Sequence, residues 1–313
     1  MFVAEAVAKR LQWEVVRRCH VREQIEAVQR MQDYIEEHLC EDISMARLAK
    51  ASLFSPWYAR RIFLEYVGIS PAEYIRKLRL KESVLRLRDQ GEKVTDVALE
   101  CGFGSVDGYQ RAFHKEYGCN PKTYSASPRP LELYIPYGVK FRNMEKRDKK
   151  MSTARKVFVQ VFDKPSRRVI IKRGVTATDY WTYCQEVGCD VWGILTSIRS
   201  IVGEPVCMWL PKEYILPGTS EYVQGVEVSE EYEGEIPEGF EVLDLPAAKY
   251  LMFQGEPFEE EDFEIAIEEI WDAEQKYDPS LIGYRWDDSN PRIQLEPVGK
   301  RGYIEFVAVK ELP

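Results

Sequence analysis

The strongest constraint on the fold is a pattern that occurs twice, fifty residues apart, between residues 43 and 124. The matching positions are Ser55, Arg61, Phe63, Gly68, Pro71 and Tyr74 in the first copy and Ser105, Arg111, Phe113, Gly118, Pro121 and Tyr124 in the second. An internal repeat indicates two copies of one supersecondary unit. Each copy runs from a short helical stretch through a tight connection into a second helix that begins at the serine. The repeat therefore predicts two helix-turn-helix units.

The composition is that of a globular protein. The chain has 313 residues, of which 45% are hydrophobic and 30% charged, enough for two or three domains. Its seven cysteines show no C-x-x-C spacing and its three histidines no metal-ligand spacing, so we expect neither a metal nor another cofactor. The sequence shows no continuous apolar segment typical of an export signal or membrane span, and we expect a cytoplasmic protein.

Charge is distributed unevenly along the chain. The formal net charge is -9, yet residues 1–150 hold 27 basic and 21 acidic side chains, whereas residues 151–313 hold 16 and 31. The basic residues of the first half also cluster in and between the repeats, at Arg60, Arg61, Arg76, Lys77, Arg79, Lys81, Arg86 and Arg88. Local positive potential of this kind suits the binding of phosphate groups.

The chain divides at a stretch rich in prolines and mixed charges. Residues 22–125 show helical periodicity, and a long helix over residues 71–88 is expected to join the two repeats. Residues 1–21 are expected to form a short amphipathic helical leader. Residues 126–153 have little apolar periodicity and are expected to be a linker. Residues 154–313 then form a second domain.

Beyond the linker the apolar period changes to two residues, which is typical of strands. Strands are predicted from Val157 onward and over residues 206–210, 222–228, 240–245, 249–254, 292–295 and 303–309. Helices are expected over residues 178–201, with a break near Gly188, and over residues 260–277. The chain is thus predicted to be multidomain, with an all-α double helix-turn-helix domain followed by an α+β domain that contains a βαββ repeat.

The second copy of the repeat resembles the signature of AraC/XylS-type transcription regulators. The residues that carry the resemblance are the Gly102-Phe103 turn, Arg111-x-Phe113, and Gly118-x-x-Pro121-x-x-Tyr124. The resemblance implies two helix-turn-helix units joined by a long helix. In that family, the two recognition helices enter successive major-groove turns on one face of duplex DNA.

The same resemblance indicates which side chains would contact DNA. A recognition helix packs one face on its own bundle and projects polar or aromatic side chains into the groove. In the first copy Trp57, Arg60 and Arg61 point outward and match DNA-contacting positions of the family. Either arginine can contact guanine in a bidentate manner, and Trp57 can pack on a sugar or a thymine methyl. In the second copy Gln110 and Arg111 are the candidates, and we expect this helix to support binding mainly through phosphate contact.

The acidic second domain resembles the GyrI-like effector-binding domains of some AraC-type and MerR-type multidrug regulators. The resemblance rests on the element order, on residues 240–253, on a helix containing Trp271, and on a late strand containing Gln294 and Glu296. It implies two βαββ halves with a ligand cleft between them, where a carboxylate among aromatic rings receives a cationic, apolar ligand. Gln294 occupies the position that is usually glutamate, and Glu296, two residues further on, can replace it.

Candidate ligand contacts are side chains that would recognise such a molecule. Aromatic rings supply dispersion and cation-π attraction, and a carboxylate supplies charge complementarity. The candidates are Trp181, Tyr183, Trp192, Trp209, Tyr250, Trp286, Gln294, Glu296 and Glu305. Any single aromatic residue of this set is also a candidate for plain core packing.

Three classes of function remain to be separated. An enzyme is one, since some GyrI-like domains are thought to hydrolyse small ligands, although no histidine follows His114 and only glutamate-based acid-base catalysis stays open. An architectural DNA-binding protein is disfavoured by the large second domain. We expect a non-enzymatic, ligand-responsive transcription regulator. Its expected partners are double-stranded DNA, a small-molecule effector and RNA polymerase, but no membrane.

Overall fold

The computed structural model describes residues 21–139, 156–188 and 190–312. Among these, residues 21–125 and 136–139 form one compact unit, and residues from 126–135 and from 156 onward form the other. Residues 1–20 of the expected leader and 140–153 of the expected linker lie outside the described residues. The first unit is helical and the second is built on one antiparallel sheet, which agrees with the two fold classes expected from the sequence.

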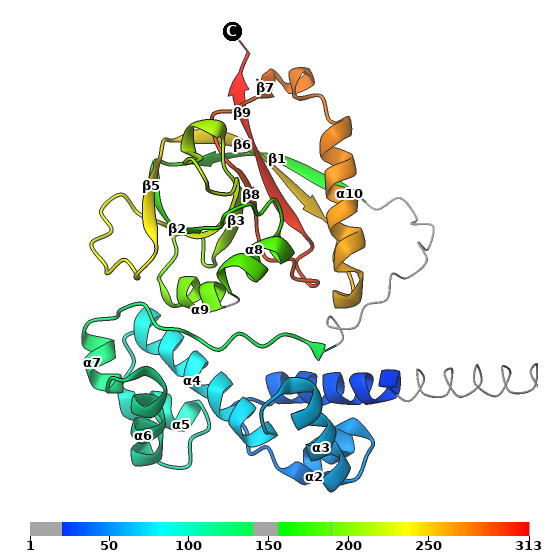
Figure 1. Ribbon diagram of the computed structural model, residues 1–313, viewed down its shortest axis with the longest axis vertical. Coiled ribbons are helices and arrows are strands. Elements are labelled where there is room, and N and C mark those ends of the chain that lie inside the picture. The colour runs from blue at the N-terminus through cyan, green and yellow to red at the C-terminus, as the bar shows by residue number, and fades with distance from the viewer. Residues whose placement is uncertain (1–20, 140–155, 189, 313) are drawn as a thin grey trace, which may run out of the picture. The chain divides into compact units, whose positions relative to one another are not determined.

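The first unit contains the helices of the two predicted repeats (Figure 1). The first described residues, 21–37, form a helix. The first repeat comprises α2 (Met45–Ser52) and α3 (Pro56–Val67), and the second comprises α5 (Val94–Glu100) and α6 (Val106–Tyr117). Between them runs α4 (Pro71–Asp89), and α7 (Pro121–Ala126) follows the second repeat. The long connecting helix is confirmed, and it ends one residue beyond the predicted position.

The residues shared by the two repeats begin and end the same helices. Ser55 caps the amino end of α3 by accepting a hydrogen bond from the Tyr58 amide, and Ser105 caps α6 through the Gly108 amide. Gly68 and Gly118 follow these helices with φ of 87° and 69°. A side chain is disfavoured at such positive φ, so both copies require glycine there.

The shared aromatic residues hold each repeat to the helix that follows it. Phe63 and Phe113 are fully buried. The Phe63 ring meets the Tyr74 ring at a centroid distance of 5.3 Å, and Phe113 meets Tyr124 at 5.9 Å. Each pair places the recognition helix on the first turns of the next helix through edge or tilted ring contacts, a favoured aromatic geometry. The residues that repeat in the sequence therefore make the same phenylalanine-tyrosine contact in both copies.

Part of the expected linker is packed against the second unit. Leu131 and Leu133 are buried, and the Leu131 amide donates a hydrogen bond of 2.8 Å to Ser197 Oγ. A Cβ atom on Gly193 would lie 2.1 Å from the Leu133 carbonyl oxygen, so the segment passes directly over that glycine. Proline content correctly indicated the absence of helix and strand here, but not this burial.

The second unit is a nine-stranded antiparallel sheet (Figure 1). Its strands are β1 (Val157–Lys164), β2 (Arg167–Arg173), β3 (Val206–Trp209), β4 (Tyr222–Val228), β5 (Glu241–Leu245), β6 (Ala248–Gly255), β7 (Tyr284–Trp286), β8 (Arg292–Gln294) and β9 (Ile304–Glu311). Their order is β1-β6-β9-β8-β3-β4-β2-β5, with β7 paired to β9. In the centre, β3 and β8 pair with Met208 opposite Ile293 and Trp209 opposite Arg292.

Three helices pack on this sheet. The predicted helix with a break near Gly188 is present as α8 (Tyr180–Val187) and α9 (Asp190–Ser197), both against β4. The predicted later helix is α10 (Phe263–Lys276), which packs on β6. Apolar side chains of the helices, such as Leu195 and Ile270, are fully buried in the clusters that they form with the strands.

Strands β2 and β7 were not predicted. The β2 sequence has three consecutive apolar residues between arginines and lysine, and a short apolar run without alternation does not distinguish a strand from other buried structure. The strand predicted over residues 292–295 ends at Gln294, so Glu296 lies beyond it. The expectation that Glu296 shares a strand face with Gln294 is therefore wrong.

Candidate functional site

Helix α3 exposes the three side chains proposed to read DNA. Its inner face is made by Ala59, Ile62 and Phe63, all fully buried. On the opposite side Arg60 and Arg61 are exposed, and 73% of the Trp57 surface is accessible. A tryptophan this exposed contributes little to its own core, so it is available for an external contact.

Aromatic rings orient Arg61 on this surface. Its guanidinium carbon lies 4.8 Å from the Tyr58 ring centroid and 5.7 Å from that of Trp57. Tyr58 in turn accepts a hydrogen bond of 2.6 Å from Gln24 Nε2, which ties the ring to the helix that ends at residue 37. The cation-π contacts restrict the rotamers of Arg61, so less conformational entropy is lost when it binds a partner.

Helix α6 offers fewer exposed groups. Tyr109 is fully buried, while Gln110 and Arg111 are exposed. The leading turn exposes Asp107, and its Gly108 has no side chain. A carboxylate repels phosphate, so the two repeats differ in the chemistry of their outward faces.

Most of the basic cluster on α4 is engaged within the protein. Lys77 pairs with Glu116, Arg86 with Glu92 and Glu100, and Arg88 with Asp89. Arg79 donates to the backbone carbonyls of Leu39, Glu41 and Gly102. The interpretation of this cluster as a phosphate-binding surface is therefore wrong for these four residues. Spacing alone did not show the carboxylates and carbonyls that tertiary packing brings beside them.

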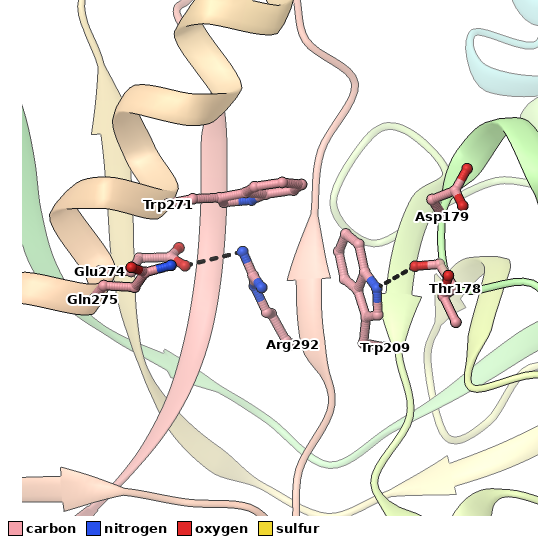
Figure 2. A pocket seen from close by; sticks show the side chains of 7 residues that line it. All are labelled: Thr178, Asp179, Trp209, Trp271, Glu274, Gln275 and Arg292. Carbon is pink, nitrogen blue, oxygen red and sulfur yellow. Dashed lines mark hydrogen bonds and ion pairs between the residues drawn. The ribbon is translucent and has the colours of Figure 1, made fainter.

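The second unit contains a small pocket at the junction of β3, β8, α10 and the turn before α8 (Figure 2). Its volume is about 200 Å³. The residues that line it are Thr178, Asp179, Trp209, Trp271, Glu274, Gln275 and Arg292. Trp209 donates a hydrogen bond of 2.9 Å from Nε1 to the Thr178 carbonyl, which holds the indole in place on one side.

Arg292 occupies the space between the two indole rings in this pocket (Figure 2). Its guanidinium carbon lies 5.0 Å from the Trp209 ring centroid and 5.4 Å from that of Trp271. It forms an ion pair of 3.0 Å with Glu274 and a second, close pair with Glu305. One cation therefore lies among two aromatic rings and two carboxylates.

The two carboxylates differ in their hydrogen bonds. Glu305 is fully buried and accepts hydrogen bonds of 2.9 Å from both Trp271 Nε1 and Tyr303 OH, besides its pair with Arg292. Burial, and then repulsion by Glu305, raises the pKa of Glu274 to about 8. Burial also raises the pKa of Glu305, but three donors favour its charged form, so we assign the shared proton to Glu274.

The predicted ligand residues are spread over this unit. Trp209 lines the pocket, and Glu305 contacts its Arg292. Tyr183, Trp192 and Tyr250 are buried in the core. The remaining four lie apart from the pocket lining: Trp181 is exposed on α8, Trp286 is exposed on β7, Gln294 ends β8, and Glu296 is exposed beyond it.

Trp271, Glu274 and Arg292 were not among the predicted site residues. Trp271, Glu274 and Gln275 are spaced i, i+3 and i+4 on α10, so they share one helix face, and this spacing was a usable signal. Arg292 gave no such signal. Its position depends on its pairing with Trp209 across β3 and β8.

Within residues 21–139, 156–188 and 190–312, no helix combines the length and apolarity that crossing a bilayer demands. In the same part of the chain, histidine, cysteine and acidic side chains nowhere gather into a group suited to a metal ion.

The first unit has the construction of a helix-turn-helix DNA-binding domain, and comparisons with known proteins agree. A family described as a helix-turn-helix domain matches residues 48–127. The right origin-binding protein of Escherichia coli is 33% identical over 95 residues, which are 30% of this chain and 33% of that protein. The regulatory protein SoxS of Salmonella typhimurium is 30% identical over 97 residues, which are 31% of this chain and 91% of SoxS.

A solved structure matches the same region. The DNA-binding domain of AdpA, determined in complex with a target DNA, is 25% identical over 32% of this chain and 91% of that domain, with a TM-score of 0.31. The matched region spans about a third of the right origin-binding protein but nearly all of SoxS. The chain belongs to the AraC family through its helix-turn-helix domain.

Proposed function

We propose that this chain is a DNA-binding transcription regulator that responds to a small ligand. Helix α3 reads duplex DNA, and the second unit binds an aromatic or apolar molecule, favoured when cationic, in the pocket between Trp209 and Trp271. The observation that carries the ligand-binding part is that one cationic side chain, Arg292, contacts two indole rings and two carboxylates in this pocket. RNA polymerase is the expected downstream partner, and the chain acts as a regulator rather than as a catalyst.

Recognition of the DNA base sequence is proposed to come mainly from α3. Trp57, Arg60 and Arg61 are exposed along one side of a helix that begins at a serine cap, a position from which side chains reach base edges. Helix α6 contributes through Arg111, which suits a phosphate contact. An exposed acidic residue and a glycine in its leading turn leave it less suited to base reading.

The strand order supports a GyrI-like arrangement of two βαββ halves. The first half is β2, α8 with α9, β3 and β4, and the second is β6, α10, β8 and β9. From one end the strand order is β1-β6-β9-β8, and from the other end it is β5-β2-β4-β3. Corresponding strands of the two halves therefore hold the same place in the sheet, with β1 matched to β5, β6 to β2, β9 to β4 and β8 to β3. The halves meet where β3 pairs with β8, and the pocket lies at this junction. Ligand sites commonly occur at such junctions.

The charge of the pocket favours a cation. Glu305 is held in its charged form and pairs with the single arginine of the pocket, and Asp179 lines the same pocket. Asp179 caps α8 by accepting hydrogen bonds from the amides of Trp181 and Thr182, and these keep its pKa below the ordinary value, so it is charged at neutral pH. Indole rings add cation-π attraction.

The DNA-reading part is tested by selection from a random duplex library. The wild-type chain should enrich one motif, and Arg60→Ala should enrich a relaxed version of it. Lys115→Ala, on the exposed outer side of α6, serves as the control and should leave the motif unchanged. Enrichment of the same motif by Arg60→Ala would remove Arg60 from the set of base-reading residues.

A second candidate function is acid-base catalysis on the bound ligand. The observation in its favour is Glu274, whose pKa of about 8 suits proton transfer near neutral pH. Against it, no histidine follows His114, so the second unit has no histidine to pair with a nucleophile beside this carboxylate. Mass spectrometry of a ligand incubated with the full chain separates the two functions, because a sensor returns the ligand unchanged and an enzyme does not.

A further inference from the structure

Arg292 has the contacts that a bound cationic ligand would make. Its guanidinium lies between Trp209 and Trp271 and pairs with Glu274 and Glu305 (Figure 2). The partners of Arg292 are contributed by β3, α10 and β9, so three elements converge on one side chain. A flat, delocalised cation is weakly hydrated and stacks well on indole, which explains why a guanidinium fits this place.

The pocket is too small for a drug-sized ligand while Arg292 is in place. The volume left beside the arginine is about 200 Å³. Pockets that enclose drug-sized molecules usually measure about 300–1,000 Å³. A ligand that contacts both indole rings therefore needs the volume that the guanidinium now fills.

The Arg292 side chain is partly open to solvent, although its Nε and Nη2 atoms are buried. Its side chain is 33% exposed, whereas Glu305 is fully buried and Glu274 nearly so. The carboxylates therefore stay inside while the cation can turn toward water. Its departure would leave buried negative charge uncompensated, which is costly unless another cation arrives.

We propose that Arg292 is a built-in competitor that holds the ligand site closed until a flat aromatic cation, of the amidinium or guanidinium class, replaces it between Trp209 and Trp271. This inference rests on the proposed ligand-binding function of the pocket. The exchange conserves charge inside the site, because one cation leaves as another enters. Arg292 thereby sets the ligand concentration at which the pocket fills and excludes neutral molecules of the same shape.

The test uses the full chain and a matched pair of probes. Benzamidinium and benzamide have nearly the same shape and differ in charge. In calorimetric titrations, benzamidinium should bind the wild-type chain and benzamide should bind at least tenfold more weakly. Arg292→Gln keeps a planar group that can donate to Glu305 but removes the competing charge, so it should bind benzamidinium at least tenfold more tightly than the wild type. Arg285→Gln, an exposed arginine on β7, makes the same charge change away from the pocket and should bind like the wild type.

The outcomes separate this inference from the ligand-binding proposal. If benzamidinium binds the wild type but Arg292→Gln gives no gain over Arg285→Gln, Arg292 is not a competitor, and the pocket remains a ligand site. If benzamidinium binds none of the three proteins, the pocket is not a cation site and the inference is overturned with it. A crystal structure of the wild type with benzamidinium decides the matter without any variant. Arg292 displaced from between the indoles supports competition, and Arg292 in place overturns it.

Discussion

Arg79 of α4 donates a hydrogen bond of 2.6 Å through Nη1 to the carbonyl of Gly102, in the turn of the second helix-turn-helix. Its Nε atom donates to the Leu39 carbonyl at 2.8 Å, so one guanidinium joins α4, the turn after the first described helix and the second repeat. Gly102 has a φ of 79°, and a Cβ atom there would lie 2.8 Å from the Arg79 guanidinium carbon. The turn thus accommodates this arginine only with glycine.

Arg79→Met should destabilise the helical unit by about 2 kcal/mol, because hydrogen bonds made by a charged donor contribute about 1.5–3 kcal/mol. The measurement is the midpoint of the helical unfolding transition in urea. Arg76→Met, on the same helix but half exposed, is the control and should shift the midpoint little. Equal midpoints for the two variants would show that the Arg79 contacts do not stabilise the unit.

Arg60→Ala should weaken binding to the selected DNA motif by about 1–3 kcal/mol, since a bidentate contact with a base contributes that much discrimination. Arg111→Ala should instead weaken binding to all duplexes alike and lower the salt dependence, because phosphate contacts release counterions. Anisotropy titrations at several salt concentrations measure both effects. A salt slope unchanged in Arg111→Ala would exclude the phosphate contact.

Leu53→Gly should stabilise the helical unit. Leu53 follows α2 with a φ of 63°, the only positive value among the non-glycine residues that the structure describes, and its side chain is 79% exposed. The left-handed conformation costs a residue with a Cβ about 1 kcal/mol, and few contacts are lost with the side chain. The melting temperature should therefore be higher in Leu53→Gly than in the wild type, but not in Leu53→Ala, which keeps the Cβ atom. A rise of the same size in both would point to the exposed side chain instead.

The titration of Glu274 should make stability depend on pH. Its pKa is about 8 in the folded chain and 4.5 ordinarily, so the unfolded chain loses the proton first as the pH rises. Stability should therefore fall from about pH 4.5 to pH 8. Glu274→Gln removes the titrating carboxyl group, and with it this pH dependence, while Arg292, Glu305 and Asp179 remain at the site. The melting temperature of the variant relative to the wild type should be higher at pH 8 than at pH 5. A difference independent of pH would contradict the raised pKa.

The helical unit was largely predictable because its determinants are local. A serine cap, a glycine at positive φ and a phenylalanine-tyrosine contact lie within about twenty residues of each other in each repeat. The exposure of Trp57 followed from helical periodicity. The partners of Arg79 did not follow, because they are backbone carbonyls brought together by packing.

The sequence alone determined two helix-turn-helix copies, an α+β second unit and the unequal outward faces of α3 and α6, since periodicity and capping act over a few residues. Only the tertiary structure decided which aromatic residues line a pocket and which fill a core. Trp209, Trp271 and Arg292 are distant in sequence and meet through the pairing of β3 with β8 and the packing of α10, while Tyr183 and Tyr250 are buried. The kinds of side chain that form the site could be predicted from the sequence. Register and helix placement, which are long-range properties of the folded chain, determined where those side chains lie.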